Sequence, residues 1–142
     1  MIIDAHTHLH RTPDFETARQ NLLQSMDRAG IDKAALFAFP SRELTNEDAI
    51  RISAEHPDKF FAIGSVSPLV LAKKSTSRFD AELKRSLHRR DLHGLKFYTG
   101  YEHFYASDVD LIAPYCAMLE KVGLPAIFHT GDTYNAVPGA RI

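Results

Sequence analysis

The sequence predicts an α/β fold of parallel strands, each followed by a helix, and three observations indicate it. Five short apolar segments are spaced along the chain as buried strands would be. Apolar residues recur at helical spacing between them, which implies right-handed crossovers and a parallel sheet. A closed (β/α)₈ barrel has eight such units in about 250 residues, whereas these 142 residues end after the fifth strand. We therefore expect one domain, residues 1–142, made of (β/α) units that stop after the fifth parallel strand.

The expected strands are short and almost wholly apolar, as is typical of strands buried on both faces of a parallel sheet. They cover residues 2–5, 31–39, 60–66, 94–98 and 126–128. Pro40 ends the second of them, and the glycine and proline of residues 123–125 make the turn before the fifth. Residues 133–142 resemble a loop, so we expect no sixth strand.

The first two helices carry start and stop signals. Thr12 and Pro13 predict the N-cap and first residue of the first helix, and Gly30 predicts its end. Thr45, followed by Asp48 three residues later, predicts a capping pair at the start of the second.

The last two helices are equally marked by their apolar residues. Phe79, Leu83 and Leu87 line one face of the third, whose other face is basic. The fourth covers residues 108–122 and contains Pro114, so it begins or kinks there.

The composition excludes several classes of protein. The chain has 17 basic and 18 acidic residues and a formal net charge of −1, so we expect no partnership with nucleic acid and none with an anionic membrane. No apolar run approaches the roughly 20 residues of a membrane span. The one cysteine, Cys116, cannot form an internal disulfide. We expect a soluble, cytoplasmic protein.

Histidines follow the first and the last predicted strand. His6 and His8 are two residues apart, so they point the same way if the strand continues through them. His129 ends the fifth strand, and parallel strands place their carboxyl ends at one edge. Three imidazoles at one edge suit Zn²⁺ or a similar divalent ion. The alternative is that His6 and His8 are solvated and that His129 merely closes its strand.

A lysine and several aromatic residues follow the fourth strand. Lys96 lies inside an apolar segment, where it either meets a substrate anion or a metal-bridging group, or extends its amine to solvent. Tyr98 and Tyr101 either wall a small-molecule pocket or pack as an ordinary loop. Glu102 and His103 are acid–base groups that nothing in the sequence singles out.

Three motifs together resemble the amidohydrolase superfamily, and within it the amidohydrolase-2 group of metal-dependent hydrolases and decarboxylases. They are IIDAHTHLH at the first strand, GLKFY at the fourth and LPAIFHTGD at the fifth. The resemblance implies that residues 1–142 are the N-terminal part of a distorted (β/α)₈ TIM barrel, truncated after the fifth parallel strand. It further implies that His6, His8 and His129 are metal ligands. It also implies that Lys96, on strand four, bridges two metals or binds a substrate carboxylate. The group's histidine after strand six and aspartate after strand eight have no counterpart in these residues.

The function implied by the resemblance is metal-dependent hydrolysis, in which metal-activated water attacks an amide or ester-like bond of a small molecule. A decarboxylase of the same group is one alternative. A TatD-like deoxyribonuclease is another, disfavoured by Lys96 and by the absence of a basic surplus. A non-catalytic metal-binding half-barrel is a third, and its open strand edges predict a homo-oligomer. A flavodoxin-like fold is disfavoured because no phosphate-binding loop follows the first strand.

Overall fold

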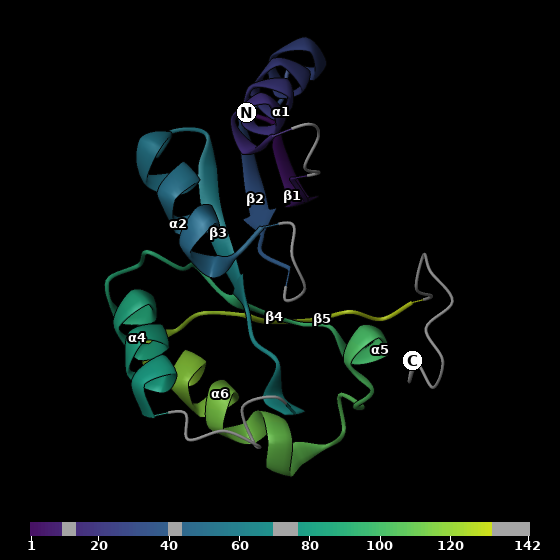
Figure 1. Cartoon of the computed structure of the whole chain (residues 1–142), viewed down its shortest axis with the longest axis vertical. Helices are drawn as coiled ribbons and strands as arrows, with labels where there is room; N and C mark the ends of the chain where they lie inside the picture. The colour runs from purple at the N-terminus through teal and green to yellow at the C-terminus, as the bar shows by residue number, and fades with distance from the viewer. Residues whose placement is uncertain (10–13, 40–43, 70–76, 132–142) are drawn as a thin grey trace. The chain divides into compact units, whose positions relative to one another are not determined.

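The computed structural model (Figure 1) describes residues 1–9, 14–39, 44–69 and 77–131. Two compact units make up the chain, residues Met1–Gly64 and Ser65–Ile142. His10, the expected helix start at Thr12 and Pro13, and the expected loop 133–142 lie outside the described residues. Each unit pairs parallel strands and places helices between consecutive strands, which confirms the predicted α/β class.

The strands of the first unit pair in chain order. β1 (Ile3–Thr7) pairs with β2 (Lys33–Phe37), which pairs with β3 (Phe60–Ser65). All of β2 except its first residue is buried, because this strand has neighbours on both sides. β1 is the more exposed strand, and its register with β2 shifts between Asp4 and Thr7. His6 lies within this irregular stretch, and His8 follows it.

The first helix starts later than the sequence predicted. α1 spans Phe15–Ala29, and its N-cap is Asp14, whose carboxylate accepts a hydrogen bond from the Thr17 backbone N–H. The expected cap at Thr12 is therefore wrong, because Asp14 takes up the extended backbone and supplies the capping oxygen. Gly30 ends the helix as predicted, in the left-handed conformation with φ of 68°.

The second helix confirms its sequence signal. α2 spans Asn46–Glu55, and Thr45 and Asp48 form the reciprocal capping box. Ile52 is fully buried, and the neighbouring Ser53 hydroxyl donates to the Phe60 carbonyl oxygen at 2.9 Å. This bond joins α2 to the first residue of β3.

The second unit is built around two short parallel strands, β4 (Leu95–Phe97) and β5 (Ala126–Phe128). The two strands start close together. A Cβ added to Gly94 would lie only 3.0 Å from the Pro125 carbonyl oxygen. Any side chain at position 94 would therefore crowd this carbonyl oxygen. The Leu95 N–H donates to that same carbonyl, which aligns the two strands.

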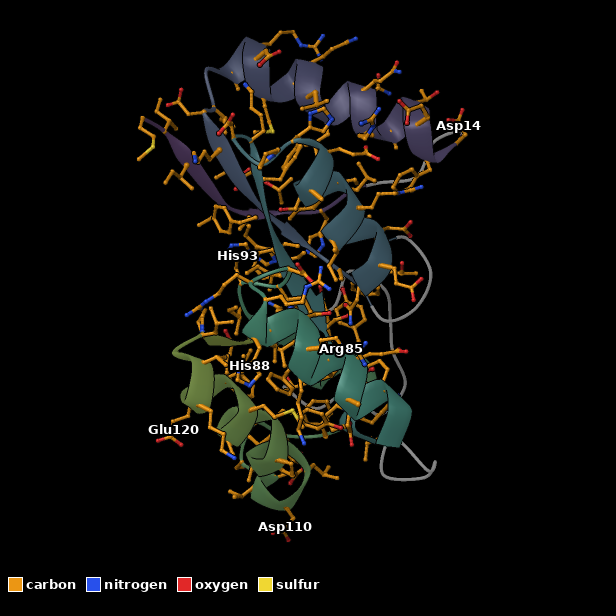
Figure 2. All side chains as sticks on the ribbon, turned by 90° about the vertical axis from the view of Figure 1, so that its left-hand side faces the viewer. Asp14, Arg85, His88, His93, Asp110 and Glu120 are labelled. Atoms are coloured by element: carbon orange, nitrogen blue, oxygen red, sulfur yellow. The ribbon has the colours of Figure 1, made fainter. Side chains whose placement is uncertain are left out.

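Three described helices accompany these strands: α4 (Ser77–His88), α5 (Thr99–Glu102) and α6 (Val109–Val122). α4 packs against α6, as Figures 1 and 2 show. The Arg90 guanidinium, just after α4, donates to the Val122 carbonyl oxygen at the last turn of α6. α6 runs through Pro114 from a start five residues earlier, so the helix does not begin at the proline.

Two differences from the sequence prediction affect the site. The second and fourth strands are shorter than expected, at residues 33–37 and 95–97. The residues after β4 form the short helix α5 where a loop was expected. This helix carries Thr99, Tyr101 and Glu102 directly beyond the carboxyl end of β4.

Candidate metal centre and substrate site

The first unit brings two predicted metal ligands together. The Nε2 atoms of His6 and His8 are 3.1 Å apart, and the ring centroids are separated by 4.9 Å. Zinc–nitrogen bonds are about 2.0–2.1 Å long, so two nitrogens that share an ion lie within about 4.2 Å of each other. The 3.1 Å separation is a hydrogen-bond distance between the two imidazoles, and it is also short enough for both nitrogens to reach one divalent ion.

The His6–His8 pair is held by its neighbours in the sheet. The Asp4 carboxylate accepts the His6 backbone N–H at 2.9 Å, and this bond is the main cause that lowers the pKa of Asp4. The Phe37 ring, at the end of β2, lies 4.3 Å from the His6 ring and 5.9 Å from the His8 ring, between centroids. Phe37 was not predicted from the sequence, because only the pairing of β1 with β2 brings it to the histidines.

His129 lies immediately after β5 in the second unit, and its main chain is fixed at both ends. Its backbone N–H donates to the Phe97 carbonyl oxygen at 2.9 Å, and its own carbonyl oxygen accepts the Thr99 hydroxyl at 2.7 Å. Thr99 is buried. It was not predicted, and its only sequence signal is a hydroxyl directly after an apolar strand.

Two tyrosine rings accompany the His129 side chain. The Tyr101 ring lies 5.3 Å from the imidazole, between centroids, and the Tyr98 ring lies 6.4 Å from it in a stacked orientation. Tyr101 is half-buried, whereas Tyr98 is only 2% exposed. Burial, followed by the Glu102 carboxylate and then Tyr101, raises the pKa of Tyr98, so its phenol keeps its proton at neutral pH.

Lys96 is buried in this same unit. Its side chain is on β4, the residue is 3% exposed, and its Nζ lies 5.6 Å from the centroid of the Tyr98 ring. Burial lowers the pKa of Lys96 because the charged amine is kept from water. The interpretation that this lysine extends to solvent is therefore wrong. Lys96, Tyr98, Tyr101 and His129 form one cluster at the carboxyl ends of β4 and β5.

Glu102 is distinguished from exposed carboxylates by its burial, which the sequence alone does not show. Glu102 ends α5 and is half-buried, and its Oε2 atom is shielded from solvent without a hydrogen-bond partner among the described residues. The Ser67 hydroxyl hydrogen-bonds the carboxyl group. Burial raises the pKa of Glu102 to about 7, against this bond from Ser67.

Other features of the described residues limit the site. No group of three or more His, Cys, Asp or Glu side chains is clustered as a metal site in residues 1–9, 14–39, 44–69 and 77–131. His6 and His8 belong to one unit and His129 to the other, so the structure describes the His6–His8 pair and His129 separately.

No helix in the described part of the chain is both long and apolar enough to cross a membrane.

No family model matches the sequence, and no curated protein matches it either. Solved structures do match. One is a probable 2-pyrone-4,6-dicarboxylic acid hydrolase from Acinetobacter baumannii with citric acid bound, at 17% identity and a TM-score of 0.64, over 91% of this chain and 49% of that one. Another is 4-oxalomesaconate hydratase from Rhodopseudomonas palustris, at 15% identity and a TM-score of 0.66, over 92% and 52% of the two chains.

A third structure is 5-carboxyvanillate decarboxylase from Novosphingobium aromaticivorans with bound manganese and 3-methoxy-4-hydroxy-5-nitrobenzoic acid. It matches at 22% identity and a TM-score of 0.59, over 84% of this chain and 39% of that one. This chain therefore spans about half the length, or less, of the solved structures that it matches. Over most of its residues this chain has the parallel α/β fold of these three enzymes, as the sequence predicted.

Proposed function

We propose that the protein is a metal-dependent hydrolase of the amidohydrolase-2 type, which uses water to attack an amide or ester-like bond of a small molecule. The observation that carries this proposal is the 3.1 Å separation of the His6 and His8 Nε2 atoms at the end of β1. The strand end is the edge at which (β/α) barrels bind their ligands. The fold likeness to a probable 2-pyrone-4,6-dicarboxylic acid hydrolase supports the proposal.

His6, His8 and His129 are the proposed metal ligands, and the divalent ion is most simply zinc because all three donors are imidazoles. Bound at these residues, such an ion supplies a water of lowered pKa and a positive charge that polarises the substrate carbonyl. Thr99 and Phe97 fix the main chain that carries the His129 ligand. Manganese is the other metal to test, because the decarboxylase structure contains it.

Lys96, Tyr98 and Tyr101 are the proposed substrate-binding residues. The buried Lys96 ammonium is suited to a substrate carboxylate, since an anion stabilises the charge that burial disfavours. The half-buried ring of Tyr101, which lies beside both the Tyr98 and the His129 rings, supplies an apolar wall. The similar structures contain citric acid, a nitrobenzoate or 2,6-dihydroxybenzoate, all of them carboxylic acids.

Decarboxylation is the second candidate reaction. It is favoured by Lys96 and by the fold likeness to 5-carboxyvanillate decarboxylase and to 2,6-dihydroxybenzoate decarboxylase, the latter at 18% identity and a TM-score of 0.60. In that case Lys96 holds the carboxylate of the substrate before carbon dioxide leaves, and Tyr101 contacts its ring. A deoxyribonuclease is disfavoured, because the chain is not basic and a buried lysine occupies strand four. A non-catalytic metal-binding half-barrel predicts metal without turnover.

We also propose a cytoplasmic location and self-association. The single cysteine is consistent with a reducing compartment. Ile2 and Ile3, at the start of β1, are 58% and 47% exposed. A second copy of the chain could cover this apolar surface.

The deciding experiment is the metal content of the full-length protein, measured by mass spectrometry for zinc and manganese together. His6→Ala and His8→Ala should each lose most of the bound metal, whereas His88→Ala, at an exposed histidine of α4 (Figure 2), should keep it. Turnover of 2-pyrone-4,6-dicarboxylate against that of 2,6-dihydroxybenzoate then separates hydrolysis from decarboxylation. Unchanged metal in both variants would overturn the proposal.

A further inference from the structure

Glu102 and Ser67 meet at the carboxyl ends of two neighbouring strands. Ser67 follows β3, and the Val66 N–H donates to the Lys96 carbonyl oxygen at 3.4 Å, which places this segment beside β4. Glu102 follows β4 on α5, where its backbone N–H donates to the Tyr98 carbonyl oxygen at 2.9 Å. Its carboxyl group accepts a hydrogen bond from the Ser67 hydroxyl. The proposed mechanism uses neither residue.

The carboxyl group of Glu102 is only partly satisfied. Ser67 supplies one hydrogen bond, while Oε2 is shielded from solvent and has no partner among the described residues. A buried oxygen without a partner is unfavourable by an amount comparable to a lost hydrogen bond, so native proteins rarely keep one. A ligand group that hydrogen-bonds this oxygen would remove that cost.

The neighbours of Glu102 connect it to the substrate site. Its charge acts on the Tyr98 phenol, and Tyr98 lies against the Lys96 amine and the Tyr101 ring. His103, the next residue, takes a left-handed conformation with φ of 60°, which is uncommon for a residue other than glycine. This conformation ends α5 directly after Glu102.

A hydroxyl is the ligand group that fits this carboxyl in either protonation state. It donates to a carboxylate oxygen and accepts from a protonated one. Because burial raises the pKa of Glu102 to about 7, both states are populated near neutral pH. An amide N–H or an ammonium could only donate, and a second carboxylate would be repelled by the ionised form.

We propose that Ser67 and Glu102 form a hydroxyl-binding subsite, which selects small carboxylic acids that carry a hydroxyl group. This inference rests on the proposed function, because it places the substrate at the carboxyl ends of β3 and β4. Lys96 binds the carboxylate of such a molecule, and the Glu102 carboxyl, oriented by Ser67, binds its hydroxyl.

Two matched pairs of acids test the proposal by calorimetry on the metal-loaded full-length protein. Citrate and tricarballylate differ only in one hydroxyl, and 2,6-dihydroxybenzoate and benzoate differ only in two. The hydroxylated acid of at least one pair should bind about tenfold or more tightly than its partner, as expected of a hydrogen bond to a charged group. Equal affinities within both pairs, or no binding of any of the four acids, would overturn the proposal.

Variants assign the preference to the residues. Glu102→Leu should bind the two members of the pair equally, with the affinity for the acid that lacks the hydroxyl unchanged, which also shows that the variant is folded. Glu102→Gln, which can still donate and accept, should keep most of the preference. Glu120→Gln, at an exposed carboxylate of α6 (Figure 2), is the matched control and should behave as the parent protein. A hydroxyl preference that persists in Glu102→Leu contradicts the subsite.

The hydroxyl-binding subsite and the proposed metal-dependent function can fail independently of each other. A protein that binds metal through His6 and His8 but does not distinguish citrate from tricarballylate keeps the function and loses the subsite. A hydroxyl preference that depends on Glu102, in a protein without bound metal, keeps the subsite and loses the function.

Discussion

The hydroxyl of Thr99 donates a 2.7 Å hydrogen bond to the carbonyl oxygen of His129, and the two residues are 30 positions apart in the chain. This bond joins the first residue of α5 to the residue that follows β5. This partly buried hydrogen bond therefore joins the helix that carries Tyr101, a proposed substrate-binding residue, to His129, a proposed metal ligand.

Replacing Thr99 with valine tests this contact. Valine has nearly the same shape but cannot donate, so the free energy of unfolding should fall by about 1–2 kcal/mol, as for other lost buried hydrogen bonds. Metal affinity should fall as well if the bond orients His129, and urea denaturation with metal titration measures both. Thr99→Ser keeps the hydroxyl and should restore the metal affinity. An unchanged metal affinity in Thr99→Val would show that the bond is purely structural.

Lys96→Met should separate stability from binding. Burial lowers the pKa of Lys96, so the folded protein disfavours the charged amine, and this cost is present at neutral pH and disappears as pH rises above about 10.5. Methionine removes the cost, so the variant should be at least as stable as the parent at pH 7 and should lose carboxylate binding by tenfold or more. Thermal unfolding and calorimetry with citrate measure the two effects.

Lys121→Met is the matched control for that prediction, since Lys121 is exposed near the end of α6. It removes one positive charge from the same unit and should leave both stability and binding unchanged. A large loss of stability in Lys96→Met alone would mean that the amine is part of a structural network.

Glu102 predicts a pH dependence of stability with a definite sign. Its folded pKa, about 7, is above the ordinary value of 4.5, so the folded state binds more protons between these values. The preference of the folded state for protonated Glu102 therefore adds to the free energy of unfolding below about pH 4.5. This added stability is lost as pH rises to 7, by up to about 3 kcal/mol. Glu102→Gln should lack this loss, which urea denaturation at pH 5 and pH 8 would reveal. Identical pH dependence in parent and variant would contradict it.

Gly94→Ala tests the close approach of the two strands in the second unit. The added Cβ would lie 3.0 Å from the Pro125 carbonyl oxygen and 3.1 Å from Pro125 Cγ. The carbonyl is held by the Leu95 N–H and cannot easily move, so we expect a loss of about 1–3 kcal/mol. Adding Pro125→Ala should recover only part of the loss, because the carbonyl oxygen remains. Full recovery would place the conflict at the proline ring instead.

Local signals explain why much of the fold was predictable. The capping box of Thr45 and Asp48 depends on residues three apart, and Gly30 ends its helix through its own conformation, so both were correct. The start of α1 was misplaced because Thr12 and Asp14 are both good caps, and the sequence does not show which adopts the extended backbone.

The site was only partly predictable for a related reason. His6 and His8 follow from strand periodicity, which is local, and the structure brings their nitrogens together. The burial of Lys96 and Glu102 depends on segments distant in sequence, such as Ser67, so no local pattern could distinguish Glu102 from an exposed carboxylate. Thr99 was missed because its partner is a backbone carbonyl, which any residue could supply.

The hydrogen bond from Arg90 to the Val122 carbonyl oxygen has a consequence for local unfolding. It joins the segment after α4 to the last turn of α6, and the two helices also pack against each other. Fraying of α6 from its carboxyl end therefore requires this link to break, so amide protons of both helices should exchange with solvent deuterium as one cooperative unit.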